Sequence, residues 1–264
     1  GDRSVCRGRV NHDGKLVSLV YGNPCAVNID PIEKKPLYHY KPGTPAFSIA
    51  TTGCSFRCLN CQNWQISQSS PRDTRNYDLM PDKVIAQALK YNCASIAYTY
   101  TEPTVFFEFA YETAKLAHIK GICNVFVTNG YMTSEALEMI EPYLDAANVD
   151  LKAFTNDYYK KVCGAGLKHV QATLKLMKSL DIFIEVTTLV VPGLNDDPSE
   201  LSDLAAFIVQ DLGPETPWHI SRFHPTYKLS DRPATPLKTL LRAREIGLQA
   251  GLKYVYTGNV PGEA

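Results

Sequence analysis

Short apolar runs alternate with amphipathic stretches through most of this sequence, and that alternation limits the possible folds more than any other feature. The apolar runs are rich in β-branched residues, which favours strands. Six strands are expected, at 46–52, 94–100, 123–129, 146–152, 182–191 and 218–223. Six helices are expected between and after them, at 81–92, 104–119, 133–142, 167–179, 197–210 and 236–249. Repeated strand–helix units predict an α/β fold with a parallel sheet, either open or closed into a whole or partial barrel.

The first 45 residues follow a different pattern. Residues 14–30 are expected to form two short strands around a GNP turn, and residues 31–45 are rich in proline and polar groups, as in an ordered loop or linker. We therefore divide the chain into an N-terminal β-rich extension over residues 1–45 and an α/β domain over residues 46–264.

Composition excludes several classes of partner. The 264 residues contain 27 Lys and Arg against 27 Asp and Glu, so the formal net charge is zero and no overall attraction to nucleic acid is expected. No apolar run reaches the roughly 18 residues that a membrane-spanning helix needs. The first residues also lack the apolar core of a signal peptide. We expect a cytoplasmic protein without nucleic-acid or membrane partners.

Polar groups gather where the predicted strands end. The cysteine-rich run GCSFRCLNCQNW, residues 53–64, follows the first strand. The next five strands end in YTYTEP, VTNG, VDLK, VVPGLND and RFHP. In a parallel β/α array the carboxyl ends of the strands lie on one rim, so these segments are expected to share a single site.

The cysteine run has the spacing C-x3-C-x2-C, formed by Cys54, Cys58 and Cys61. Zinc would need a fourth ligand, and the second cysteine pair that usually supplies it is absent from the sequence. A [4Fe–4S] cluster held by three thiolates would leave one iron open to a ligand with an amine and a carboxylate. The other five cysteines are expected to be buried thiols or to have no special role: Cys6, Cys25, Cys93, Cys123 and Cys163.

This motif, placed after the first strand of a β/α array, resembles the radical SAM superfamily over roughly residues 46 to 230. The resemblance implies a partial (β/α)6 parallel barrel over residues 46–264, with a [4Fe–4S] cluster and S-adenosylmethionine (SAM) as cofactors. It implies an enzyme in which the reduced cluster cleaves SAM to a 5'-deoxyadenosyl radical that abstracts hydrogen from a substrate. It further implies an electron donor such as flavodoxin or ferredoxin, and an unidentified substrate for which a protein is one candidate.

Within the superfamily, the chain looks most like the branch typified by pyruvate formate-lyase activating enzyme. The matching segments are the cysteine run, TNG (128–130), DLK (150–152) and VVPGLND (190–196). The N-terminal region from His12 to Cys54 resembles the radical SAM members of the AmmeMemoRadiSam system more closely. Two alternatives stay open: an activase of glycyl-radical enzymes, and a non-catalytic zinc or Fe–S protein with a structural or sensory metal.

The resemblance also assigns cofactor-binding roles to individual positions. The residues expected to contact SAM or the cluster are Asn60, Asn63, Thr101, Glu102, Thr128, Asn129, Asp150, Lys152 and His224. Asn60 replaces the aromatic residue that usually precedes the third cysteine. Glu102 has a simpler alternative, since a glutamate there would also favour the start of a helix. Asp150 is expected to hold either Lys152 or a ribose hydroxyl.

Overall fold

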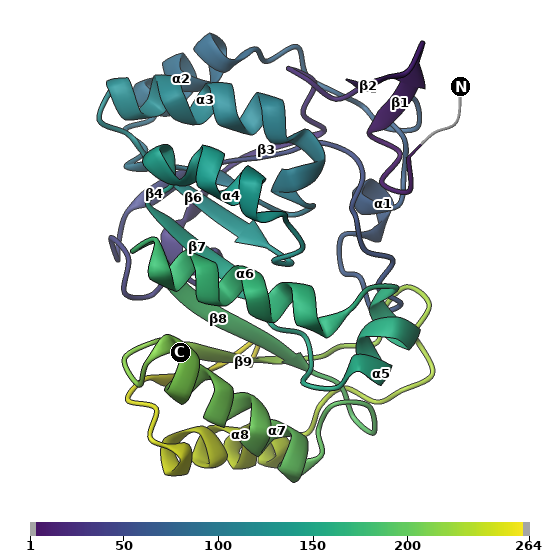
Figure 1. Cartoon of the computed structure of the whole chain (residues 1–264), viewed down its shortest axis with the longest axis vertical. Helices are drawn as coiled ribbons and strands as arrows, with labels where there is room; N and C mark the ends of the chain where they lie inside the picture. The colour runs from purple at the N-terminus through teal and green to yellow at the C-terminus, as the bar shows by residue number, and fades with distance from the viewer. Residues whose placement is uncertain (1–3, 261–264) are drawn as a thin grey trace. The chain divides into compact units, whose positions relative to one another are not determined.

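The computed structural model describes residues 4–260, in which strands and helices alternate in the predicted order (Figure 1). The chain divides into two compact units. The first contains the chain up to Phe56 and then Asn63–Asn148, and the second contains Arg57–Gln62 and the chain from Val149 onward. The chain therefore changes unit twice inside the cysteine run.

The first unit is built on four neighbouring strands. They are, in spatial order, β3 (Ala26–Pro31), β4 (Pro45–Ala50), β5 (Ser95–Tyr98) and β6 (Cys123–Thr128). Strand β3 runs antiparallel to β4, whereas β4, β5 and β6 are parallel. The helices are α1 (Trp64–Ser67), α2 (Pro81–Lys90), α3 (Phe107–Ile119) and α4 (Ser134–Ile140). Helices α2 and α3 lie side by side (Figure 1).

A separate hairpin precedes these strands. It pairs β1 (Arg9–His12) with β2 (Lys15–Ser18). Its two-residue turn, Asp13–Gly14, has positive φ angles of 51° and 80°, which are the values that suit the twist of a tight hairpin.

The second unit has three neighbouring parallel strands, β8 (Phe183–Val190), β9 (Trp218–Arg222) and β10 (Val255–Gly258). Its helices are α5 (Asn156–Tyr158), α6 (Leu167–Ser179), α7 (Pro198–Phe207) and α8 (Leu237–Ala250). Short π-helices, Tyr159–Cys163 and Ile208–Leu212, continue α5 and α7. Helices α7 and α8 pack against each other (Figure 1). Strand β7 (Ala146–Asp150) carries the chain from the first unit into the second.

The predicted α/β class with a parallel sheet is confirmed, and all six predicted strands are present. Within residues 4–260, five short elements were not predicted: β1, the 3-10 helix Ile32–Lys34, α1, α5 with its π-helix, and β10. The predicted helix over 104–119 begins as a 3-10 turn, Pro103–Phe106, before α3. No helix within residues 4–260 is both long and apolar enough to cross a membrane.

The N-terminal extension packs as part of the first unit. Strand β3 pairs with β4 along its whole length, from Ala26 opposite Ala50 to Pro31 opposite Pro45. The loop after β3 also enters the core, where Ile32 and Leu37 are fully buried. They share one apolar cluster with residues from β4 to β7: Ala46, Ala97, Val125 and Ala146. The described part of the extension, residues 4–45, is therefore a segment of the first unit.

Candidate functional site

The cysteine run begins at a position that only glycine fits. Gly53 follows β4 with φ of +99°, a conformation that side chains disfavour. A Cβ atom on Gly53 would lie 2.1 Å from the carbonyl oxygen of Cys6. The Gly53 N–H donates to the Ile66 carbonyl at 2.9 Å. The start of the run is therefore held between the extension and α1.

Cys54 lies in the first unit and is half-buried. Its sulfur accepts hydrogen bonds from the Phe56 N–H at 3.4 Å and from the Asn129 side-chain amide at 3.7 Å. Cys54 therefore has two donors directed at its sulfur, and the thiolate is the form of cysteine that binds a metal.

Cys58 and Cys61 belong to the second unit, where two backbone hydrogen bonds fix the segment around Cys58. The Arg57 N–H donates to the Cys163 carbonyl at 2.8 Å, and the Leu59 N–H donates to the Val162 carbonyl at 2.9 Å. The Cys61 N–H donates to the Cys58 carbonyl at 3.3 Å and closes a turn. Residues 57–59 therefore run alongside the end of the π-helix.

This pairing places the Cys58 thiol against Cys163, a cysteine for which the sequence indicated no role. A hydrogen bond from the Cys163 thiol lowers the pKa of Cys58, although burial opposes the shift, and the positive charge of Lys152 adds to it. The same contact raises the pKa of Cys163. Cys58 is thus the more acidic thiol of the pair, as suits a metal ligand.

Glu102 is fully buried in the first unit. Its carboxylate accepts hydrogen bonds from the Thr104 N–H at 3.2 Å, the Thr104 hydroxyl at 3.0 Å, the Thr128 hydroxyl at 2.8 Å and the Asn129 N–H at 2.8 Å. Burial raises the pKa of Glu102 even though these bonds oppose the shift. Glu102 therefore caps the 3-10 turn before α3, as its simpler alternative predicted, and also joins that turn to the end of β6.

Asn129 continues this chain of contacts to the cysteine run. Its side-chain amide donates to the Ser55 hydroxyl at 3.1 Å as well as to the Cys54 sulfur, and its side-chain oxygen accepts the Tyr131 N–H at 2.9 Å. Glu102, Thr128, Asn129 and Cys54 thus form one hydrogen-bonded group in the first unit.

Thr101 and Asn63 tie the ends of the cysteine run to the segment after β5. The Thr101 hydroxyl donates to the Thr51 carbonyl at 2.9 Å, just before the run. The Asn63 side-chain amide donates to the Tyr100 carbonyl at 2.8 Å, just after the third cysteine.

In the second unit, Asp150 and Lys152 form an ion pair with 2.8 Å between Nζ and Oδ2. One of the two predicted options for Asp150, contact with Lys152, is therefore present. The Lys152 N–H donates to the Tyr159 hydroxyl at 3.1 Å, and its carbonyl accepts the Asn195 amide at 2.7 Å. Burial alone would lower the pKa of Lys152, but Asp150 and the nearby thiols raise it well above its usual range.

The remaining predicted positions are Asn60 and His224. Asn60 is 6% exposed, within the buried part of the second unit. His224 is solvent-exposed, two residues beyond the end of β9. Two aromatic residues lie close to Asn60 in sequence, and one of them, Phe56, is buried against Tyr131 with 5.2 Å between ring centroids. The other, Trp64, is exposed at the start of α1.

The three thiols of the cysteine run are the type of ligand that an iron–sulfur cluster needs. Among residues 4–260, His, Cys, Asp and Glu side chains do not form a preassembled group of three or more that could hold a metal ion. The run does supply three thiols within eight residues. Cys54 and Cys58 both accept hydrogen bonds on sulfur, and thiolates of this kind are the ligands of such clusters.

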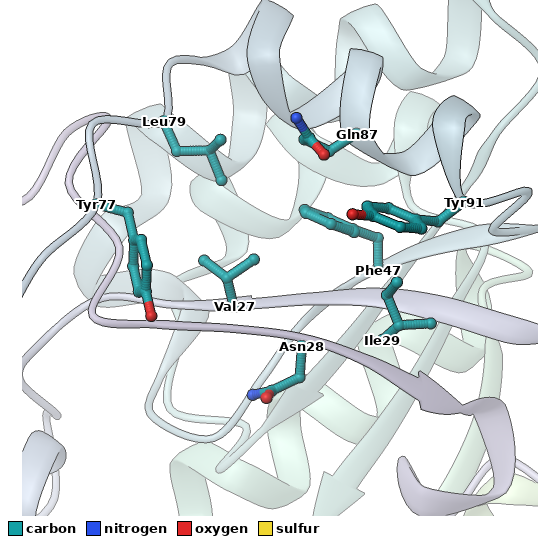
Figure 2. Close-up of a pocket in the computed structure, with 8 residues that line it drawn as sticks. All are labelled: Val27, Asn28, Ile29, Phe47, Tyr77, Leu79, Gln87 and Tyr91. Atoms are coloured by element: carbon teal, nitrogen blue, oxygen red, sulfur yellow. The ribbon is translucent and has the colours of Figure 1, made fainter.

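A pocket of about 330 Å³ lies elsewhere on the first unit, between β3, β4 and α2 (Figure 2). It is lined by Val27, Asn28, Ile29, Phe47, Tyr77, Leu79, Gln87 and Tyr91. Val27 and Ile29 point toward the Phe47 and Tyr91 rings, whereas Asn28 points to the other face of the strand (Figure 2). None of the predicted site residues lines this pocket.

Related proteins indicate which family this site belongs to. Residues 48–205 match the model of the radical SAM superfamily. An uncharacterized protein of Methanocaldococcus jannaschii is 49% identical over 262 residues, which cover 99% of this chain and 78% of that protein. The pyruvate formate-lyase-activating enzyme of Staphylococcus epidermidis is 22% identical over 173 residues, which cover 61% of this chain and 68% of that enzyme.

Solved structures share the fold at lower identity. SuiB of Streptococcus suis bound to S-adenosylmethionine has a TM-score of 0.63 and 12% identity, and the match covers 80% of this chain and 49% of SuiB. A domain of pyruvate-formate lyase-activating enzyme from Bacteroides vulgatus has a TM-score of 0.55 and 16% identity, and covers 62% of this chain and 99% of that domain. Because the family model covers more than half of its residues, this chain belongs to the radical SAM superfamily.

Proposed function

We propose that this protein binds a [4Fe–4S] cluster through Cys54, Cys58 and Cys61 and uses SAM to abstract hydrogen from a substrate. Membership of the superfamily supports the enzyme class, and the three-thiol run with hydrogen-bonded Cys54 and Cys58 is the observation that carries the cofactor proposal. When bound, the cluster would supply the electron that cleaves SAM to a 5'-deoxyadenosyl radical.

The residues of the first unit would hold the methionyl end of SAM. Four protein donors already occupy the Glu102 carboxylate, so its proposed contribution is to orient Thr128 and Asn129. Asn129 is well suited to a contact beside the cluster, because its amide already reaches the Cys54 sulfur. Thr101 and Asn63 would fix the run from both ends.

The residues of the second unit would supply charge and ring contacts. Lys152 stays protonated at neutral pH, because Asp150 and the thiols raise its pKa, and an ammonium group suits the SAM carboxylate. Asp150 would orient that ammonium through their ion pair. Asn60 and His224 are proposed to contact the adenosine.

The substrate and the reductant are proposed by class. A small flavin or iron–sulfur protein, such as a flavodoxin or ferredoxin, would deliver the electron. A protein or peptide is the favoured substrate class, since SuiB, which shares the fold, has been solved with its precursor peptide. An activase of glycyl-radical enzymes is the second candidate, supported by the likeness to pyruvate formate-lyase-activating enzymes.

One experiment separates the enzyme from a structural or sensory metal protein. The chain is reconstituted anaerobically with iron and sulfide, reduced with dithionite and mixed with SAM, and 5'-deoxyadenosine is quantified by chromatography. Wild type should release it, and Cys58→Ala should not. Cys93→Ala is the matched control, because Cys93 is a buried cysteine outside the run. A protein that purifies with tightly held zinc and cleaves no SAM would overturn the proposal.

A second measurement distinguishes the two enzyme candidates. The reduced, SAM-loaded protein is mixed with a glycyl-radical enzyme and frozen for EPR spectroscopy. A glycyl-radical signal that depends on this chain would favour the activase. SAM cleavage without that signal would favour a different substrate.

A further inference from the structure

The residue before Thr101 adopts a backbone conformation that side chains avoid. Tyr100 follows β5 with φ of +62°. The Thr101 N–H donates to the Thr99 carbonyl at 2.7 Å, which closes a three-residue turn centred on Tyr100. With positive φ at its centre this is the rare, strained form of the γ-turn, and such strain persists only where surrounding contacts enforce it.

The turn lies at the point where both ends of the cysteine run are anchored. The Tyr100 carbonyl accepts the Asn63 amide at 2.8 Å, beyond the third cysteine. The neighbouring Thr101 hydroxyl donates to the Thr51 carbonyl at 2.9 Å, before the first cysteine. The direction of these two groups depends on the turn, because a relaxed backbone at Tyr100 would rotate the Tyr100 carbonyl away from Asn63.

The Tyr100 side chain is held by charged residues of the extension. Its hydroxyl donates to the Asp30 carboxylate, and the Lys35 Nζ lies 4.4 Å from the centre of its ring. Lys35 and Asp30 form an ion pair of 2.6 Å and are 1% and 5% exposed. Figure 2 shows Asn28 pointing away from the pocket side of β3, and Asp30, two residues on, lies on that same face.

Asp30 is ionised and Tyr100 is protonated at neutral pH. Burial opposes charge on Asp30, but hydrogen bonds from Lys35, Tyr100 and Lys34 hold its pKa well below the usual range. Burial, reinforced by Asp30, raises the pKa of Tyr100 to about 12. At neutral pH the phenol therefore donates to an ionised carboxylate, which makes the contact strong and directional.

We propose that Tyr100 is a positioning residue for the cysteine run and that the buried pair Asp30–Lys35 holds it in its strained turn. A buried ion pair is weak evidence for stability, because apolar residues of similar size often replace one without loss. Its value here is conformational, since the carboxylate selects the one backbone arrangement that directs Tyr100 toward Asn63. The inference concerns the shape of the cysteine run. It rests on the proposed function only for the identity of the cofactor that the run binds.

The first test is amide hydrogen exchange, before and after cluster reconstitution, on Tyr100→Phe and Asp30→Asn. Tyr100→Phe keeps the ring and deletes the hydroxyl. Tyr21→Phe is the matched control, because the Tyr21 hydroxyl also joins the extension to a carboxylate, that of Glu112 on α3. Exchange in residues 53–63 should rise in the first two variants and stay at the wild-type rate in Tyr21→Phe.

The second test is SAM binding by equilibrium dialysis to the reconstituted protein. Loss of a hydrogen bond to a charged group should weaken binding roughly tenfold in Tyr100→Phe, with iron content near that of wild type. Unchanged exchange and affinity in Tyr100→Phe would overturn the proposal, as would equal changes in Tyr21→Phe. If Asp30→Asn does not fold, Tyr100→Phe alone decides. If wild type binds no cluster, the proposed function fails, while the exchange data on unreconstituted protein still decide the role of Tyr100.

Discussion

The contact between Gly53 and Cys6 makes a sharp prediction about how the cysteine run is built. Gly53→Ala places a methyl group at φ of +99° and 2.1 Å from the Cys6 carbonyl oxygen. No change of side-chain rotamer relieves this overlap, because one atom is a Cβ and the other is a backbone oxygen. The extension or the start of the run must therefore shift.

The expected loss of stability has two parts, and control variants separate them. The unfavourable φ alone costs roughly 1–3 kcal/mol. The overlap adds roughly 1–3 kcal/mol, as overpacking does elsewhere. Gly14→Ala and Gly43→Ala carry the first part only, since their φ angles are +80° and +77° and no atom lies within 4 Å of the added Cβ. The difference between Gly53→Ala and either control isolates the contact with Cys6.

Thermal unfolding followed by circular dichroism measures this difference. For a chain of this size a loss of 1 kcal/mol lowers the midpoint by roughly 2–4 °C. Gly53→Ala should therefore unfold at least about 2 °C below Gly14→Ala, given an overlap term of about 1 kcal/mol or more. Equal midpoints for the three variants would show that the Cys6 carbonyl does not rest on Gly53, and the account of the extension as a support for the run would fail.

Three further changes have expected outcomes. Asp30→Asn should lower the free energy of unfolding at pH 7 by about 3 kcal/mol, because it leaves a buried lysine without its counter-charge. The folded-state pKa of Asp30 lies below its ordinary 3.8, so this advantage of wild type is complete above about pH 5 and should shrink as the pH falls below 4; urea titrations at pH 7 and pH 3 test it. Gly247→Ala should destabilise by roughly 1–3 kcal/mol, because the added Cβ would lie 2.9 Å from the Trp218 ring, and a rise in thermal midpoint, the usual result in an exposed helix, would contradict that packing. Glu102→Gln should cost roughly 1–3 kcal/mol, because the amide NH₂ would face a donor in either orientation, the Thr128 hydroxyl at one oxygen position or the Asn129 N–H at the other; a urea midpoint equal to that of wild type would refute this account of the carboxylate.

The sequence predicted strands and helices well where burial is regular. Strand β6 has buried, mostly β-branched or aromatic residues, and α6 follows its predicted range of 167–179 because its apolar residues repeat at helical spacing. Strand β10 was not predicted, although Val255, Tyr256 and Thr257 favour a strand by composition. The run has only four residues, and its pairing with β9 is a long-range contact that the sequence does not specify.

For the candidate site too, the sequence predicted some residues and missed others. Cysteine spacing predicted Cys54, Cys58 and Cys61 as candidate metal ligands, and the family resemblance together with the ends of predicted strands predicted Glu102 and Asn129 as candidate cofactor contacts. The supporting residues could not be found in this way, because their partners are distant in sequence. Asp30 and Tyr100 are 70 positions apart, and although Tyr100 lies in the YTYTEP segment, nothing in the sequence pairs it with Asp30. Burial also decides between roles that a sequence leaves open, as at Glu102, where four protein donors surround the carboxylate.

These contacts give the extension a supporting role in the candidate site. Composition suggested a segment distinct from the α/β domain, yet three independent contacts join it to the parts of the first unit that form the site. Strand β3 covers the edge of β4, the Cys6 carbonyl rests on Gly53, and Asp30 holds Tyr100. Each contact acts on a different part of the cysteine run: the strand before it, its first residue and the turn that anchors both its ends. Backbone hydrogen bonds to Val162 and Cys163 fix the middle of the run, and the extension helps to fix its two ends.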